Sequence, residues 1–437
     1  MKDRDTFASK TGFVLACVGS AVGLGNLWMF PWRIGQYGGG AFLVLYLVFV
    51  FVLGTTGLMG EFGLGRWAGS GPMGAFDKIL RGKGQRFGRA LGAYPVLAIL
   101  GVMVFYAIVV GWVVRYLIAS ISGAYFGGED LGAFFGSTAG QPVSIVWHAL
   151  ALAVGAGVII FGVSRGIERV NKVIMPALFV LFFILVIRSL TLPGALEGVK
   201  YLFIPDWSYL AKPITWGMAL GQAFFTVSLS GAGMVVFGSY MKKDMDVPSS
   251  ALQTVTLDTA AAVLASLMIV PAAFAMGLDV AAGPPLLFIT LPEIFTTMAG
   301  GRIFSIIFFL GVFFAAISSL FAQMEVCVEA VQDQFAWSRK VSVAAVAGVV
   351  LVCGLPLDVN MGWFTAFVDL ITVYVAPLGA AMAAVLFFWV YPVNEARQAV
   401  NVGSVRPVGA WWEPVAKYLF VGVSVLIVVL QMLFQVG

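Results

Sequence analysis

The sequence predicts an all-α polytopic membrane protein with eleven transmembrane helices, arranged as a 5+5 inverted repeat in which helices one and six are broken. Three observations predict this class: an apolar composition, eleven apolar runs of spanning length, and glycine clusters inside the first and sixth runs. Of 437 residues, 61% are hydrophobic and 11% are charged, whereas soluble domains contain about 25% charged residues. We therefore expect the protein to reside in a lipid bilayer, without a sizeable soluble domain.

The composition also restricts the chemistry that the protein can perform. The single histidine, His148, cannot build a metal cluster or a histidine proton relay, and a net charge of +4 does not favour nucleic acid as a partner. The three cysteines, Cys17, Cys327 and Cys353, lie in apolar runs and are odd in number, so no disulfide framework is predicted. The charged N-terminus lacks a small-residue cleavage site, so we expect no signal peptide.

Eleven apolar runs are long enough to cross a bilayer, which takes about 20 residues of helix. They lie near residues 10–36, 40–66, 90–122, 146–163, 167–190, 215–240, 251–278, 302–330, 341–357, 360–391 and 414–436. The repeats are predicted to cover residues 10–190 and 215–391, with 414–436 as an accessory helix. No low-complexity linker divides residues 1–437, so we expect a single transmembrane domain.

The basic residues predict the orientation, because cytoplasmic loops retain Lys and Arg. With the N-terminus in the cytoplasm, most of the 25 Lys and Arg residues fall at cytoplasmic ends of the runs. The other side receives only Arg33, Arg115, Arg188, Lys200, Lys212 and Arg302. An odd number of spans then places the C-terminus outside, in a multi-pass protein of the inner (plasma) membrane. Of the long outer connections, 279–301 is apolar enough to form short helices that fold back as a lid.

The first and sixth runs are not expected to form continuous helices. Gly19, Gly23 and Gly25 interrupt the first run, and each glycine weakens a helix by about 1 kcal/mol relative to alanine. A matching cluster at 230–233 lies in the sixth run, shortly after Ser228. Glycines also permit close helix packing, but matched interruptions in two halves indicate the binding site of a secondary transporter. The freed N–H groups suit a carboxylate and the freed carbonyls suit a cation.

Several motifs resemble those of one transporter family. In the first run they are 19–26 (GSAVGLGN), 30–31 (FP) and 38–42 (GGGAF). In the sixth and eighth runs they are 221–222 (GQ), 224–226 (FFT), 239–240 (SY) and 313–319 (FFAAISS). Together they identify the chain as similar to the neurotransmitter:sodium symporters over runs one to ten. The resemblance implies sodium-driven import of an amino acid by alternating access, and eleven spans are similar to many bacterial members.

Two sodium sites are implied by the resemblance. The first would be formed by the Ala21 carbonyl, Asn26, Thr226, Asp258 and the substrate carboxylate. The second would be formed by the carbonyls of Gly19, Val22 and Ala315 and the hydroxyls of Ser318 and Ser319. These are the oxygen ligands that a hard cation prefers. A Ser pair in a helix often bonds back to its own carbonyls instead, but the surrounding motif favours the sodium site.

Asp258 distinguishes the chain from chloride-dependent relatives, which carry Asn at this position and bind Cl⁻ nearby. A carboxylate within the membrane is costly unless it is paired, so it is a functional candidate by default. Its natural partner here is the ion. The sequence therefore predicts two Na⁺ ions and no chloride.

A substrate site is implied beside the same breaks. Monoamine carriers of the family place Asp where this chain has Gly23, so the half-helix N-terminus and Tyr106 remain free for the carboxylate of an α-amino acid. Relatives selective for small aliphatic substrates carry a bulky aromatic residue at the position of Gly231, which predicts a larger pocket here. Gln323 would add an amide to it or form an interhelical hydrogen bond. A neutral, hydrophobic or large amino acid is expected. The implied residues are Ser20, Ala21, Leu24, Gly25, Val102, Tyr106, Phe225, Ser228, Gly231, Ser319 and Gln323.

Gates are implied on both sides of this pocket. On the cytoplasmic side, the residues that match the family's inner gate are Arg4, Asp333, Ser239 and Tyr240, with Phe7 as an aromatic plug. On the outer side Asp369 is present, but Met29 replaces the usual arginine. Arg33 lies one turn further along, so we expect it to pair with Asp369 directly or through water.

Other residues near the pocket have expected roles. Phe224 or Phe225, together with Tyr106, would form an aromatic lid above the substrate. Glu61 resembles an acidic residue that supports the broken helices. Glu325 and Glu329 are expected to lie on a solvated face, because they are spaced i and i+4 towards the cytoplasmic end of their run.

Several other functions fit some of these features. A proton-coupled amino-acid carrier would share the broken helices, but the two oxygen-lined sites favour sodium. A sensor would bind the amino acid without transporting it. A channel would need a repeated filter motif, and an intramembrane enzyme would need a nucleophile with its base or a metal cluster. The sequence contains no repeated filter motif, and its single histidine leaves little from which to build a nucleophile–base pair or a metal cluster. No enzymatic activity is therefore expected.

Overall fold

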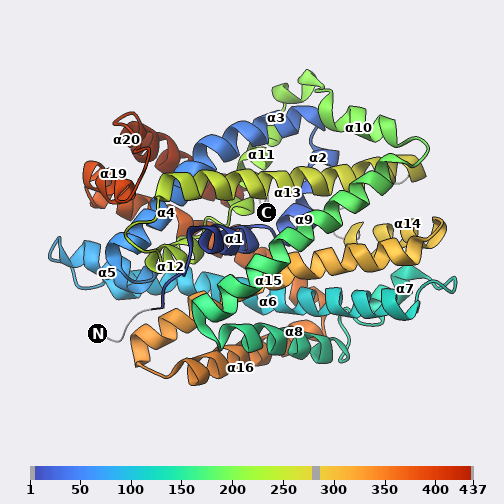
Figure 1. Ribbon diagram of the computed structural model, residues 1–437, viewed down its shortest axis with the longest axis horizontal. Helices are drawn as coiled ribbons and strands as arrows, with labels where there is room; N and C mark the ends of the chain where they lie inside the picture. Colours follow the sequence, from blue (N-terminus) through green and yellow to red (C-terminus); the bar gives the residue numbers. More distant parts are fainter. Residues whose placement is uncertain (1–4, 278–285, 435–437) are drawn as a thin grey trace.

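The chain is helical throughout the residues that the structure describes. The structure is a computed structural model that describes residues 5–277 and 286–434. Within these residues, strand-like pairing is confined to one isolated bridge between Gly39 and Pro205. Long helices run side by side along the longest axis of the molecule (Figure 1). Helices satisfy their own backbone N–H and C=O groups, as a bilayer requires. The predicted all-α class is thus confirmed.

Eight helical segments in the described part of the chain are long and apolar enough to cross a membrane. A bent pair at residues 10–36 makes a ninth span when its halves are counted together. The other two predicted spans correspond to a shorter apolar helix, α8 (Ser144–Ile159), and to a second broken pair described below. The number of eleven spans therefore stays a prediction.

The continuous spans follow the predicted runs closely. In chain order they are α3 (Gly40–Phe49), η2 (Val50–Gly54) and α4 (Thr55–Ala68); α6 (Gly88–Ser122); η3 (Val163–Glu168) and α9 (Arg169–Leu190); α13 (Val247–Met276); α15 (Gly301–Phe335); α16 (Arg339–Asp358); α17 (Met361–Asp369), η6 (Leu370–Val375), α18 (Ala376–Val385) and η7 (Leu386–Val390); and α20 (Trp412–Pro414), η8 (Val415–Phe420) and α21 (Val421–Phe434).

The first predicted break is present. Helix α1 (Lys10–Ala21) begins after Ser9, whose side chain accepts a hydrogen bond from the Gly12 N–H. The chain resumes at η1 (Gly25–Met29) and α2 (Phe30–Gln36), and the two halves are bent by 54°. Pro31 lies in the first turn of α2, directly after η1, and its ring fixes φ near the helical value.

The second predicted break separates α11 (Pro213–Thr226) from α12 (Gly233–Ser239). Between them Ser228 and Gly231 adopt positive φ angles of 56° and 72°, in the left-handed region that ends a right-handed helix. Glu61 on α4 accepts the N–H groups of Ser230 (3.1 Å) and Gly231 (2.8 Å). The carboxylate thereby satisfies backbone groups that the break leaves free.

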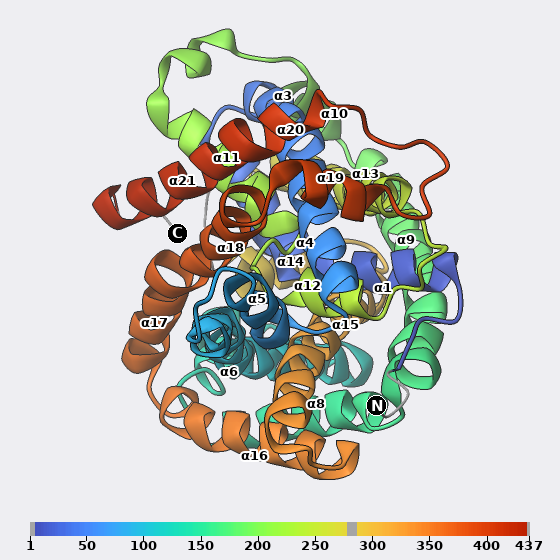
Figure 2. The same ribbon diagram turned by 90° about the vertical axis from the view of Figure 1, so that its left-hand side faces the viewer.

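The two broken spans occupy the middle of the molecule. In Figure 2, α12 lies near the centre and α1 to its right; α4 and α15 pack on α12, and α9, α13 and α15 pack on α1. Phe13 of α1 and Phe237 of α12 are fully buried. The backbone groups freed at the breaks are therefore shielded by protein, which is the condition for irregular backbone within a membrane.

The connecting segments gather at the two ends of the bundle. Helices α5 (Pro72–Arg81) and α19 (Val393–Asn401) lie at the left end of Figure 1. The helices at the right end are α7 (Leu131–Gly136), α10 (Ala195–Phe203) and α14 (Leu291–Thr297). These ends are the two sides that the Lys and Arg distribution separates.

The predicted lid is present in part. After η5 (Leu286–Thr290), α14 packs on α15 and α13 through the buried side chains of Leu291, Ile294 and Phe295. The segment therefore folds back onto the bundle, as expected. The preceding part of the predicted connection lies outside the described residues.

Candidate functional site

Three side chains predicted for the first sodium site meet beside the first break. Asn26 lies in η1, Thr226 ends α11 and Asp258 lies within α13. The Asn26 amide donates to Asp258 Oδ1 (2.8 Å) and to Thr226 Oγ1 (3.0 Å), and the Thr226 hydroxyl donates to Asp258 Oδ2 (2.8 Å). Asn26 Oδ1 also accepts the Gly23 N–H (3.2 Å), which joins this cluster to the break.

The Asp258 side chain is the acidic centre of the cluster. It is fully buried, and within residues 5–277 and 286–434 its hydrogen-bond partners are the neutral side chains of Asn26 and Thr226. A buried carboxylate without a counter-charge is unfavourable by several kcal/mol. Its oxygens, with those of the amide and the hydroxyl, are suited to a hard monovalent cation.

The residues predicted for the second sodium site lie where α15 meets the end of α1. The Ser318 hydroxyl donates to the Ala315 carbonyl at 3.0 Å. The Ser319 hydroxyl lies within hydrogen-bond distance of the carbonyl oxygens of Gly19 (3.2 Å), Ser20 (3.2 Å), Val22 (3.3 Å) and Ala315 (3.3 Å). One hydroxyl donates a single proton. Several carbonyl oxygens therefore keep lone pairs that can face a cation.

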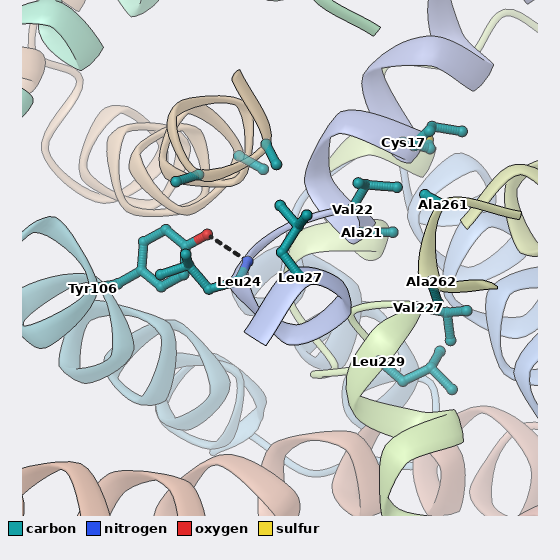
Figure 3. Packing of buried hydrophobic residues seen from close by; sticks show 14 of the residues in the cluster. Cys17, Ala21, Val22, Leu24, Leu27, Tyr106, Val227, Leu229, Ala261 and Ala262 are labelled. Atoms are coloured by element: carbon teal, nitrogen blue, oxygen red, sulfur yellow. Dashed lines mark hydrogen bonds between the residues drawn. The ribbon is translucent and has the colours of Figure 1, made fainter. Parts of the chain in front are cut away.

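The backbone between the two halves of the first span faces Tyr106. The Leu24 N–H donates to the Tyr106 hydroxyl at 3.5 Å (Figure 3). A Cβ at Gly23 would lie 2.9 Å from that hydroxyl and 2.6 Å from Ser319 Oγ. A glycine is therefore required for both hydroxyls to approach the break. N–H groups and a hydroxyl converging in this way are suited to a carboxylate.

Phe225 rather than Phe224 is the aromatic residue beside this point. Its ring lies 2.7 Å from the position of a Cβ on Gly25, and its side chain is 48% exposed. Phe224 instead stacks on Phe420 of η8, with ring centroids 5.4 Å apart. The Ser228 hydroxyl donates to the Ser20 carbonyl (3.0 Å), which joins the two breaks directly.

Val102 and Gln323 lie one turn from residues already placed at the site. Val102 precedes Tyr106 by four residues on α6, and Gln323 follows Ser319 by four on α15, so each shares a helix face with its neighbour. The Gln323 side-chain oxygen is buried and makes no hydrogen bond within the described residues. That oxygen therefore does not form an interhelical hydrogen bond, which was the alternative to a place in the substrate pocket.

The side of Gly231 on which a side chain would lie is occupied by a neighbouring helix. A Cβ at this residue would lie 2.3 Å from the Gly379 carbonyl oxygen of α18, so its Cα faces a neighbouring helix. The positive φ of 72° also favours glycine. The missing side chain is explained by backbone conformation and close packing, and a place for Gly231 in the substrate pocket stays a prediction.

The predicted inner gate is only partly as expected. Arg4 lies outside the described residues, and Asp333 lies 3.6 Å from Arg89 of α6. The Ser239 hydroxyl donates to the Val236 carbonyl of its own helix (2.6 Å). Tyr240 donates through its hydroxyl to Glu325 (2.7 Å).

Phe7 does form an aromatic plug at this end. Its ring is fully buried among Phe13, Phe237 and Tyr240, with ring centroids 5.1, 5.7 and 6.4 Å away. The Phe7 N–H also donates to the Tyr240 carbonyl (3.2 Å). The segment before α1 is therefore held against the end of α12.

Glu325 and Glu329 do not lie on a solvated face. Glu325 is fully buried, accepts the Tyr240 hydroxyl and forms an ion pair with Arg339 of α16. Glu329 is 7% exposed and accepts the Gly71 N–H at 2.9 Å. The i, i+4 spacing places both residues on one face of the helix. It does not indicate which neighbouring helices supply their hydrogen-bond and ion-pair partners.

The expected outer ion pair is also absent from this structure. Arg33 is buried, and its guanidinium donates to the Gln222 side-chain oxygen at 3.0 Å. Asp369 is exposed, and no ion pair joins it to Arg33 within the described residues. Arg33 instead contacts α11, so the direct pair is not formed, and pairing through water stays a prediction. Gln222, in a motif already noted in the sequence, is the partner that was missed.

Comparison with known proteins places this geometry in a family. A sequence model described as the Sodium:neurotransmitter symporter family matches residues 4–126 and 137–436. The chain belongs to the sodium:neurotransmitter symporter family. This confirms the resemblance seen in the sequence motifs, and it is a family of symporters rather than enzymes.

Individual members of the family resemble the chain over most of its length. An uncharacterized sodium-dependent transporter of Bacillus subtilis is 38% identical over 360 residues, which cover 82% of this chain and 79% of that protein. Another from Methanocaldococcus jannaschii is 30% identical over 448 residues, covering 95% and 87%. The crystal structure of MhsT in complex with L-phenylalanine matches with a TM-score of 0.87 at 34% identity, covering 98% of this chain and 99% of that one.

Proposed function

We propose that the protein is a symporter that imports a neutral, hydrophobic or large α-amino acid with two Na⁺ ions and without chloride. The observation that carries the proposal is the pair of oxygen clusters, one around Asp258 and one around Ser319, on either side of the first break. Between them the Leu24 N–H and the Tyr106 hydroxyl provide the groups that a substrate carboxylate needs.

Family membership and the solved relative support the amino-acid substrate. MhsT was crystallised with L-phenylalanine, and this chain has the same fold over nearly its whole length. Gly23 supports it further, because a carboxylate side chain there would occupy the space of Tyr106 and Ser319. The half-exposed ring of Phe225 and the free oxygen of Gln323 favour a large side chain.

Alternating access would use the contacts at the N-terminal end of α1. The buried Phe7 ring and the Glu325–Arg339 pair would close this route, while Phe225, beside Gly25, would border the opposite side of the break. The proposed import further requires the N-terminus in the cytoplasm of the cell, the C-terminus outside, and a 5+5 inverted repeat over 10–190 and 215–391.

Uptake into proteoliposomes tests the coupling. The purified protein would be given a panel of radiolabelled neutral amino acids including L-phenylalanine, with an inward Na⁺ gradient or with K⁺ replacing Na⁺. We expect accumulation with Na⁺ alone. Accumulation driven by a proton gradient without Na⁺ would favour the proton-coupled carrier. Saturable binding without accumulation would favour the sensor.

Chloride replacement tests the role of Asp258. With gluconate replacing chloride, uptake by the wild type is expected to be unchanged, because the carboxylate already supplies the negative charge. In Asp258→Asn the half-saturating Na⁺ concentration should rise about tenfold or more without chloride and recover partly when chloride is added. Loss of wild-type uptake in gluconate would contradict chloride independence.

A further inference from the structure

Asn171 of α9 is a buried amide whose oxygen the protein does not use. The side chain is fully buried, and its nitrogen donates to the Ile167 carbonyl of the preceding turn (2.9 Å). Its oxygen has no hydrogen-bond partner within the described residues. A buried acceptor left unsatisfied destabilises the folded state, so this oxygen requires an explanation other than packing.

That oxygen lies beside the second oxygen cluster. A Cβ on Gly19 would come within 2.1 Å of Asn171 Oδ1 and within 3.1 Å of Ser318 Cβ. The amide oxygen and the Ser318 side chain therefore border the same space next to Gly19. The missing side chain of Gly19 is what admits the amide, and α9 packs against both α1 and α15.

We propose that Asn171 Oδ1 is a further ligand of the second sodium ion. The inference rests on the proposed function and adds a third helix to a cluster otherwise formed by α1 and α15. A neutral amide oxygen is a hard donor that suits Na⁺, and it completes the set formed by the carbonyls of Gly19, Val22 and Ala315. The ion in turn satisfies the one buried acceptor that the fold leaves free at this point.

Two substitutions separate a ligand from a structural amide. Asn171→Leu keeps a similar volume and removes both polar groups, whereas Asn171→Asp keeps an oxygen and removes the nitrogen that donates to Ile167. Ser189→Ala is the matched control, because Ser189 also lies on α9, is 3% exposed and has a hydroxyl without a partner in the described residues. It is remote from the cluster, near the far end of the same helix.

The measurement is a sodium titration of thermal stability in the full-length purified protein without substrate, with choline keeping the ionic strength constant. Bound ligand stabilises the folded state according to its concentration relative to Kd. Asn171→Leu is expected to raise the half-maximal Na⁺ concentration about tenfold or more. Asn171→Asp should leave it equal or lower, and Ser189→Ala should leave it unchanged. At saturating Na⁺, half-maximal binding of L-phenylalanine should match the wild type in all three.

Two results overturn the inference. The first is a half-maximal Na⁺ concentration for Asn171→Leu that equals that of the wild type. The second is a half-maximal Na⁺ concentration for Asn171→Asp that is higher than that of the wild type, because the weaker sodium binding would then be due to loss of the nitrogen. If Asn171→Leu does not fold, the test rests on the half-maximal Na⁺ concentration of Asn171→Asp compared with that of the wild type. A wild type without any sodium response would overturn the proposed function as well, whereas a normal wild-type response leaves that function standing.

Discussion

Gly23 and Gly231 are both essential to the breaks, but for different physical reasons. Gly23 leaves room for two hydroxyls, whose oxygens would lie 2.6 and 2.9 Å from a Cβ there. Gly231 adopts a left-handed φ and faces the Gly379 carbonyl. The sequence identifies both glycines as helix breakers, because that property is local. Which atoms fill the space of the missing side chain depends on residues far along the chain.

Alanine at position 231 is expected to destabilise the protein. A left-handed conformation costs a non-glycine residue roughly 1–2 kcal/mol, and the new Cβ would overlap the Gly379 oxygen 2.3 Å away. The melting temperature of Gly231→Ala in detergent should therefore fall, together with substrate binding. Gly217→Ala is the control on the same span, because nothing lies within 4 Å of its Cβ position. Equal melting temperatures for the two variants would contradict the packing argument.

Arg33 should be coupled energetically to Gln222 and not to Asp369. The guanidinium donates to the Gln222 oxygen at 3.0 Å in a buried setting, and contacting residues typically show coupling of about 0.5–3 kcal/mol in double-mutant cycles. The cycles would use alanine substitutions and the Na⁺-dependent binding free energy of L-phenylalanine. Additivity for Arg33 and Gln222, with coupling for Arg33 and Asp369, would restore the original expectation.

At the scale of elements, the broken spans depend on a helix that is itself continuous. Glu61 of α4 accepts two N–H groups from the break between α11 and α12. Its other oxygen is buried without a hydrogen-bond partner in the described residues. The position of both breaks could be predicted from glycine clusters alone. The supporting carboxylate was suggested by family resemblance, since nothing local to Glu61 specifies which helix it contacts.

Glu61→Ala is expected to lose stability and Glu61→Gln to retain most of it. Removing the acceptor leaves two buried N–H groups unsatisfied, each at a cost of about 1–3 kcal/mol. Glutamine keeps one side-chain oxygen in the same place and can preserve both hydrogen bonds. Melting temperature and substrate binding would be compared for both variants. If glutamine is as damaging as alanine, the negative charge matters and the acceptor geometry alone does not explain the role of Glu61.

At the scale of the whole molecule, the sequence predicted the long helices better than it predicted the contacts between charged groups. The lengths of the apolar runs predicted the long helices well, because the length and apolar character needed to cross a bilayer are properties of each run by itself. The partners of charged groups could not be read from local patterns, as Arg33 and Glu325 show, because a partner is chosen by the packing of helices distant in sequence. The residues of the two predicted sodium sites lie close together, and the family motifs rather than any local pattern indicated them; sodium binding by these residues stays a prediction.

The predicted orientation of the bundle in the membrane is tested directly by cysteine labelling. The three native cysteines would first be replaced by alanine. Gln85→Cys lies in the exposed segment between α5 and α6, and Glu129→Cys lies in the exposed segment before α7, at the opposite end of the bundle (Figure 1). Because basic residues cluster around Gln85, it should lie in the cytoplasm. A membrane-impermeant maleimide applied to intact cells should therefore label only Glu129→Cys, and permeabilised cells should show labelling of both. Labelling of Gln85→Cys alone in intact cells would invert the topology and with it the direction of transport.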